Sequence, residues 1–173
     1  MNAAPAVAAF PTPFGVLEAI ASHGRLLGVR FCWSDPPRPA SGADPALDAL
    51  GSQLDRYLGG EAITFALPID WERVEGLRRD VLRATAEVPH GGTTTYGSLA
   101  EAVGRPGEAR AVGQVLKRNP WVLVVPCHRV VASTGALTGY AGGPRTGGHL
   151  DVKAALLAHE REWSEPTLFG PPR

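Results

Sequence analysis

A helix, a tight turn and a second helix, predicted between residues 95 and 120, are the part of the sequence that most constrains the fold. Thr95 can cap the first helix, and the apolar residues after it have the spacing of one buried helix face: Tyr96, Leu99, Ala100 and Val103. Gly-Arg-Pro-Gly at 104–107 predicts the turn. The second helix has its own apolar face, made by Val112, Val115 and Leu116, and ends at Asn119-Pro120. This order is typical of a helix-turn-helix.

The outer face of the second predicted helix carries polar residues at regular spacing. They fall at i, i+3, i+4 and i+7, which places them on one stripe: Arg110, Gly113, Gln114 and Lys117. Two cations, an amide and a glycine that lets another backbone approach closely suit a nucleic-acid groove. A solvent-exposed helix face without a ligand is the alternative interpretation.

The formal net charge is zero, but the charges are unevenly distributed along the chain. Residues 1–70 hold 4 basic and 7 acidic residues, whereas residues 71–173 hold 13 and 10. Between 105 and 145 one acid, Glu108, faces six basic residues: Arg105, Arg110, Lys117, Arg118, Arg129 and Arg145. This excess predicts a local basic patch, with scattered, solvated surface charge as the alternative.

The rest of the chain divides into short elements. Residues 16–33 predict a β-hairpin that turns at His23-Gly24, and a helix is predicted from Asp44-Pro45 to Gly59-Gly60. Alternating apolar residues at 63–67 predict a strand, and a further helix is predicted from about residue 74 to the Pro-His-Gly-Gly at 89–92. We therefore expect two units, a small α/β domain at 1–69 and a second domain at 70–173.

The composition favours a soluble globular protein, because 44% of the 173 residues are hydrophobic. No apolar run approaches the roughly 20 residues that cross a bilayer, and the start lacks a signal-peptide pattern. We therefore expect a cytoplasmic protein with no membrane partner. Cys32 and Cys127 lie outside any zinc-ligand spacing, so neither a disulfide framework nor a metal site is predicted.

An apolar run at 121–125 predicts a buried strand that leads into Pro126-Cys127-His128-Arg129-Val130. A single cysteine in such a place is most often an inert, buried side chain. An imidazole or a cation beside a thiol, however, raises the thiolate fraction, and the thiolate is the nucleophile. His128 and Arg129 could supply that environment. Because adjacent residues of an extended chain point apart, we expect His128 to act through a water or a turn.

The pentapeptide at 126–130 resembles, residue by residue, the active-site signature of the O6-alkylguanine-DNA alkyltransferases, also called methylated-DNA-protein-cysteine methyltransferases. Further matches to motifs of that family extend over nearly the whole chain: 12–15, Tyr96 within 95–100, 110–113, Asn119-Pro120, 139–143 and 156–160. The resemblance implies a small RNase H-like α/β domain. A mostly α, winged-helix-like domain that contains the helix-turn-helix would follow it.

The resemblance also implies a function, which is direct and irreversible DNA repair. Cys127 would take an alkyl group from O6 of guanine, or from O4 of thymine, in double-stranded DNA. The nucleotide must first flip out, because O6 is shielded inside the duplex. Since the thioether product is a poor leaving group, each molecule would act once, as a monomer and without a cofactor.

Individual roles follow by the same resemblance. Glu160 would orient His128, which would act on Cys127 through a water in a triad-like relay. Asn119 would connect the active-site turn to the helix-turn-helix. Arg110 would fill the space that the base vacates, and Tyr96 would help to rotate the nucleotide. A phosphate contact for Arg110, a core-edge tyrosine and a surface charge at position 160 are the respective alternatives.

The remaining expected contacts concern the DNA and the pocket. Thr95, Gly113, Gln114 and Lys117 complete the predicted DNA-binding surface. In the pocket, the carbonyls of Cys127 and Val130 would accept from the guanine N2 amino group, and the Tyr96 hydroxyl would serve N3 and then O6. The main-chain N–H of Ala141, which stands where some members have serine, would donate to O6. Tyr140 and Trp121 are expected to complete the pocket wall.

One departure from the family pattern follows Tyr140, where residues 142–149 lengthen the loop with Gly-Gly-Pro-Arg-Thr-Gly-Gly-His. We hypothesise that this insertion, with its core at 144–149, widens or covers the pocket and changes the tolerance for bulky adducts. Three other functions are open. They are lesion binding without repair, which Cys127 argues against, alkyl transfer on a small molecule, which would leave the stripe unused, and a plain helix-turn-helix regulator.

Overall fold

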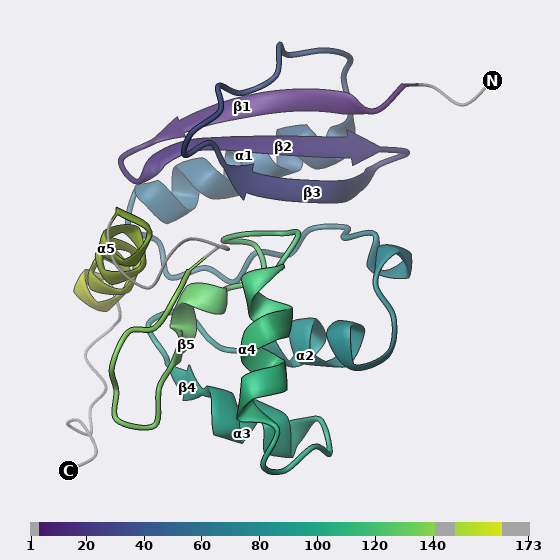
Figure 1. Ribbon diagram of the computed structural model, residues 1–173. Coiled ribbons are helices and arrows are strands. Elements are labelled where there is room, and N and C mark those ends of the chain that lie inside the picture. The colour runs from purple at the N-terminus through teal and green to yellow at the C-terminus, as the bar shows by residue number, and fades with distance from the viewer. Residues whose placement is uncertain (1–3, 141–147, 164–173) are drawn as a thin grey trace.

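The computed structural model describes residues 4–140 and 148–163, and it shows a mixed α/β protein (Figure 1). Strands β1 (Ala6–Thr12), β2 (Gly15–Ser22) and β3 (Arg25–Phe31) form an antiparallel sheet in the order β1-β2-β3. The predicted hairpin is confirmed as β2–β3. His23 and Gly24 both have positive φ, 53° and 72°, as a two-residue turn of the primed type requires.

Strand β1 was not predicted from the sequence. It pairs with β2 along its whole length, from Ala6 opposite Ala21 to Thr12 opposite Gly15. Three alanines and a proline in seven residues give little strand signal. Pro11 is tolerated because β1 is an edge strand, where a missing N–H costs no ladder bond.

Helix α1 (Pro45–Leu58) begins and ends where the sequence predicts. Asp44 caps it by accepting from the backbone N–H of Ala46 at 2.9 Å, and its second carboxylate oxygen accepts from Gly24 in the hairpin turn at 3.0 Å. The helix buries Leu47, Leu50, Leu54 and Tyr57 and covers one face of the sheet (Figure 1). We call β1–β3 and α1 the sheet unit.

The strand predicted at 63–67 is wrong. Its apolar residues do turn inward, as at Ile63, but the segment has no neighbouring strand. The backbone N–H and C=O of Ala66 instead bond to the side-chain amide of Gln53 in α1, at 2.8 and 3.0 Å. Period-two alternation therefore describes an extended segment here, because a strand also needs a backbone partner.

The three expected helices of the second half are present: α2 (Gly76–Ala86), α3 (Tyr96–Ala102) and α4 (Ala109–Lys117). A single 3-10 turn, η1 (Trp71–Arg73), precedes them. Thr95 caps α3 by accepting from the N–H of Ser98 at 3.0 Å. Short strands β4 (Thr94–Thr95) and β5 (Val130–Val131) pair in parallel, which joins the start of α3 to the chain after Cys127.

The predicted strand at 121–125 is also wrong, although all five residues are buried. The chain makes isolated bridges there, and Leu123 takes the left-handed conformation with φ 73°. The N–H of Val125 bonds back to the carbonyl of Trp121 at 2.8 Å, closing a tight turn. A second turn, η2 (Cys127–Arg129), follows at once, so Cys127 stands between two turns.

Helix α5 (Gly148–Glu162) returns to the sheet unit and lies beside the end of α1 (Figure 1). One hydrophobic cluster joins the sheet, the helices and the 121–125 turn, from Leu17 through Trp121 to Leu156. None of the helices in the described parts of the chain is long and apolar enough to cross a membrane.

Candidate active site

Cys127 lies at the start of η2, in a pocket of about 740 Å³ between α3, α4 and the segment at 132–140. Cys127 is 5% exposed, and in the described part of the chain this pocket gives access to its thiol. Burial in a lined cavity distinguishes Cys127 from Cys32, which lies half-buried on the chain just after β3. The site therefore admits a group that enters the pocket and excludes larger surfaces.

The polar stripe predicted on α4 borders the same pocket. Its four residues, Arg110, Gly113, Gln114 and Lys117, all line it, and three of them are exposed to solvent. The expected basic patch is smaller than predicted, because Arg129 is fully buried and paired with Glu160. Arg145 and most of the glycine-rich insertion lie outside the described residues, which omit 141–147.

Tyr96 forms part of the pocket wall, and its ring lies next to Gly113 of the stripe. Its hydroxyl donates to the carbonyl of Thr138 at 3.0 Å and accepts from the Thr138 hydroxyl at 3.2 Å. Burial raises the pKa of Tyr96, so the phenol stays protonated and can donate a hydrogen bond to a bound group. Thr95, one residue earlier, is half-buried and occupied with capping α3.

His128 and Glu160 are in contact, as the resemblance implies. Nε2 of His128 lies 2.7 Å from Oε1 of Glu160, and both side chains are fully buried. A carboxylate can only accept, so Nε2 carries the hydrogen and Nδ1 has the free lone pair. Within the described part of the chain, Nδ1 is buried without a hydrogen-bond partner. His128 is thus a neutral base with its accepting atom pointing away from Glu160.

The pKa shifts of this pair agree with that role. Burial lowers the pKa of His128, although the hydrogen bond to Glu160 and its charge oppose the shift. Burial alone would raise the pKa of Glu160, but hydrogen bonds and positive charge from His128 and Arg129 outweigh it and lower the pKa. Near neutral pH, Glu160 is ionised and holds an imidazole that can take up a proton.

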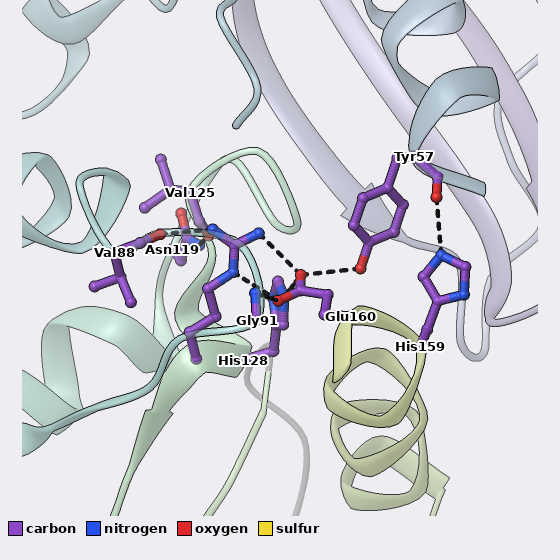
Figure 2. Close-up of polar contacts among 9 residues, drawn as sticks. Tyr57, Val88, Gly91, Asn119, Val125, His128, His159 and Glu160 are labelled. Carbon is purple, nitrogen blue, oxygen red and sulfur yellow. Dashed lines mark hydrogen bonds and ion pairs between the residues drawn. The ribbon is translucent and has the colours of Figure 1, made fainter. Parts of the chain in front are cut away.

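Glu160 has more partners than sequence reasoning foresaw (Figure 2). Arg129 donates from Nε to Oε2 and from Nη2 to Oε1, both at 2.9 Å, and also donates to the carbonyl of Val88 at 2.6 Å. The backbone N–H of Gly91 donates to Oε2 at 3.2 Å, and the Tyr57 hydroxyl donates to Oε1 at 3.0 Å. Arg129 therefore acts as a buried counter-ion, not as a direct neighbour of DNA.

Asn119 closes the turn at 121–125, which leads into Cys127. Its amide donates to the carbonyl of Val125 at 2.8 Å and its oxygen accepts from the N–H of Trp121 at 3.0 Å. Because Asn119 comes two residues after the end of α4, these bonds fix α4 to the loop that leads to the cysteine. This is the connection that the resemblance implies.

Lys153 is a functional-site residue that sequence reasoning missed. It is fully buried on α5, and its ammonium donates to the carbonyls of Val130 at 2.7 Å, Thr138 at 3.2 Å and Gly139 at 3.3 Å. Burial lowers its pKa to about 8. The helical spacing of 153, 156, 157 and 160 could have indicated it, since Leu156, Leu157 and Glu160 share that buried face.

The predicted pocket wall is only partly correct. Tyr140 lines the pocket, and burial raises its pKa well above the usual value. Trp121 does not contribute, because its fully buried ring packs 5.2 Å from Trp71 and donates to the carbonyl of Leu26. Val130 is fully buried and its carbonyl already accepts from Lys153. Ala141 lies outside the described residues.

No three His, Cys, Asp or Glu side chains within residues 4–140 and 148–163 come close enough to hold a metal ion. The residues that line the pocket offer one thiol, two phenols, two aliphatic hydroxyls, one side-chain amide and two cations. A thiol in such a pocket can act as a nucleophile once it is deprotonated.

Comparison with known proteins gives consistent results. Residues 76–162 match the family described as the DNA binding domain of 6-O-methylguanine DNA methyltransferase. A methylated-DNA-protein-cysteine methyltransferase of Mycolicibacterium paratuberculosis is 43% identical over 139 residues, which cover 80% of this chain and 76% of the relative.

Solved structures extend the similarity to the whole fold. The crystal structure of the Mycobacterium tuberculosis O6-methylguanine methyltransferase is 30% identical and superposes with a TM-score of 0.79, covering 95% of this chain and 98% of the other. A structure of the Mycobacterium tuberculosis OGT in complex with DNA is 33% identical, with a TM-score of 0.74 and coverage of 90% and 92%.

Proposed function

This chain belongs to the methylated-DNA-protein-cysteine methyltransferase family, and we propose that it repairs DNA by moving an alkyl group from O6 of guanine to Sγ of its own Cys127. One observation carries the proposal. The thiol and the exposed stripe of α4 line a single pocket, so a helix able to lie against DNA stands beside the nucleophile. O4 of thymine, which has the same chemistry, is a second possible substrate.

The depth of the thiol supports nucleotide flipping. A base stacked in a duplex cannot reach a side chain that is 5% exposed inside a pocket, so the damaged nucleotide must rotate out of the helix. Arg110 is exposed at the pocket entrance and is long enough to fill the vacated space. Gly113, Gln114, Lys117 and Thr95 then contact the backbone around the lesion.

The proposed transfer step balances with residues of this chain. Nδ1 of His128 takes the proton of Cys127 through a water, while Glu160 stabilises the imidazolium. The thiolate attacks the alkyl carbon, the carbon–oxygen bond breaks, and its electron pair stays on the guanine. Tyr96 donates a hydrogen bond to the purine, and the proton taken from Cys127 passes from His128 through water to the purine, which leaves both side chains as they began. The carbonyls of Cys127 and Val130 with the Ala141 N–H are proposed to hold the edges of the purine. Sulfur ends as a thioether, so one molecule repairs one base without a cofactor.

The finer architecture is part of the same proposal. A three-stranded antiparallel sheet covered by one helix supports an RNase H-like unit at 1–69. The contacts among α2, α3 and α4, with the short β4–β5 pair, support a winged-helix-like unit at 70–173. We also place the protein in the cytoplasm, as a monomer. A reactive thiol needs a reducing compartment, and Trp163 is the one exposed large hydrophobic residue in the described regions.

The competing functions lack an equivalent observation. Lesion binding without repair does not require a buried His–Glu pair beside the cysteine. Alkyl transfer on a small molecule does not require the exposed stripe at the pocket entrance, and a plain helix-turn-helix regulator requires neither feature. Activity on a free nucleoside that does not depend on the salt concentration would favour alkyl transfer on a small molecule.

Intact-mass spectrometry after incubation with duplex DNA that contains O6-methylguanine tests the proposal. We expect a gain of one methyl group per molecule, mapped to Cys127 by peptide sequencing. Cys127→Ala should abolish the gain, whereas the matched control Cys32→Ala, which removes the other thiol, should keep it. A wild-type protein that gains no methyl group would refute the assignment.

A further inference from the structure

Tyr57 is the last buried residue of α1, and it joins the sheet unit to the helix that carries Glu160. Its phenol donates to Oε1 of Glu160 at 3.0 Å, and its backbone carbonyl accepts from Nε2 of His159 at 2.8 Å (Figure 2). Both side chains of the first contact are fully buried. Two hydrogen bonds from Tyr57 therefore hold α5 against α1 next to Glu160.

The donors around Glu160 have different sources. Gly91, His128 and Arg129 belong to the second half of the chain, whereas Tyr57 comes from the sheet unit. Oε1 accepts from three of them at once: the Tyr57 hydroxyl, Nε2 of His128 and Nη2 of Arg129. Burial, and next the neighbouring Glu160 charge, raise the pKa of Tyr57, so its phenol stays a donor over the working pH range.

We propose that Tyr57 is a positioning residue for alkyl transfer, through which the sheet unit sets the orientation and basicity of Glu160 and thereby of His128. The inference rests on the proposed function, because it assumes that the Glu160–His128 pair activates Cys127. Tyr57 acts in two ways. It holds the carboxylate in the plane that faces His128, and it withdraws part of the negative charge that Glu160 would otherwise share with the imidazole.

The direction of the pH effect follows from the second action. Without the phenol, Oε1 accepts more strongly from Nε2, which favours the protonated imidazole. Arg129 on η2 and Lys153 on α5 are the other charges acting on His128, and His90 and His159 contact Tyr57. None of these is altered by removing one hydroxyl. The pH at which His128 becomes a competent base should therefore rise.

Tyr57→Phe isolates the hydroxyl. The phenylalanine ring keeps the packing against Phe65, His90 and His159, whose ring centroids lie 5.5, 5.8 and 5.0 Å away. Thr85→Val is a matched control, because it also removes a buried hydroxyl, one that bonds only within α2 as far as the described contacts show, to the carbonyl of Val81 at 2.7 Å. Unfolding in urea and single-turnover transfer to methylated duplex are measured for both variants and the wild type.

We expect Tyr57→Phe to slow transfer at saturating DNA by roughly tenfold, the lower range seen when outer partners of a catalytic ligand are removed from metalloenzymes. The half-saturating DNA concentration should not change, and the midpoint of the pH–rate profile should move to higher pH. Thr85→Val should match the wild type in rate and midpoint. A Tyr57→Phe profile identical to that of the wild type overturns the proposal, as does a lower stability with an unshifted midpoint.

A double-mutant cycle separates action through Glu160 from any independent effect. If Tyr57 acts through the carboxylate, adding Tyr57→Phe to the Glu160→Gln variant should slow transfer by less than twofold. A double variant slowed by the product of the two single effects would contradict the proposal. If the proposed function itself were wrong, the wild type would gain no methyl group on Cys127, which distinguishes that failure from a failure of the Tyr57 proposal.

Discussion

Two buried glutamates, Glu18 in the sheet and Glu160 in α5, show how the same side chain serves two purposes. Each is at most 1% exposed, and each binds two basic side chains. The partners of Glu18, Arg30 and Arg38, keep 43% and 54% of their side chains in solvent, whereas those of Glu160 keep 2% or less. Glu18 thus links a strand to a loop. Glu160 is a charge buried together with its partners, and those partners determine how it acts on His128.

The geometry around Glu18 explains its structural role. It lies on the central strand β2 directly opposite Arg30 on β3, and it accepts from the backbone N–H of Arg38 at 2.6 Å. The carboxylate therefore holds the Pro-rich segment after β3 against the sheet. Because the two arginines remain hydrated, losing the carboxylate would strand no charge in a dry interior.

The largest expected effect comes from Glu160→Ala. It leaves the fully buried guanidinium of Arg129 without its counter-ion, which should cost about 3–5 kcal/mol in the free energy of unfolding. Alkyl transfer to Cys127 should fall by at least roughly 100-fold, because His128 loses the group that orients it. Urea unfolding and intact-mass kinetics measure the two effects.

Glu18→Ala is the matched control for that variant. We expect a loss of about 1–2 kcal/mol, reduced by the exposure of both arginines, with the transfer rate within about twofold of the wild type. Equal stability losses in the two variants would contradict the distinction between a glutamate with hydrated partners and one with buried partners.

Replacing one arginine partner of each glutamate should rank the stability losses in the same order, with smaller values. Arg129→Met leaves Glu160 buried with fewer donors and should destabilise the fold by about 2–4 kcal/mol. Arg38→Met removes a partner that is more than half exposed and should cost less than about 1 kcal/mol. Thermal unfolding of the two variants in parallel measures the difference, and an inverted order would contradict it.

The smallest expected effect is the loss, at low pH, of the contribution that Glu18 makes to stability. Burial opposes ionisation, but hydrogen bonds from Arg38 and Arg30 lower the pKa of Glu18 from 4.5 to about 2. A carboxyl with a depressed folded-state pKa contributes fully above about pH 4.5 and loses that contribution as the pH falls toward 2. Urea unfolding should therefore show a shallower acid loss for Glu18→Gln than for the wild type, and equal slopes would count against the lowered pKa.

The sequence was informative wherever a local pattern decides the structure. The Asp44 cap, the Gly59-Gly60 stop, the turn at His23-Gly24 and the helices around 104–107 all depend on residues a few positions apart. The signature around Cys127 also predicts the nucleophile and its histidine, since those residues are adjacent. The α4 stripe was recognisable because helical spacing places its residues on one face.

Local patterns failed where a partner from elsewhere in the chain decides the outcome. Residues 63–67 alternate like a strand but bond to Gln53, and 121–125 is as apolar as a strand but folds into a turn at Leu123. Trp121 was expected in the pocket and packs on Trp71 instead. In each case the apolar residues pack inward as predicted, but the partner that they or their backbone meet was not predicted.

The sequence by itself determined the bounds of α1, the stripe on α4 and which thiol is proposed to react, because each depends on neighbours along the chain. Only the tertiary structure decided which groups surround Glu160. Tyr57 is 103 residues away from it, and Arg129, which the sequence predicts in a surface patch, is instead its buried counter-ion. Desolvation explains the difference, since a charge removed from water needs partners in space, and the fold alone brings them there.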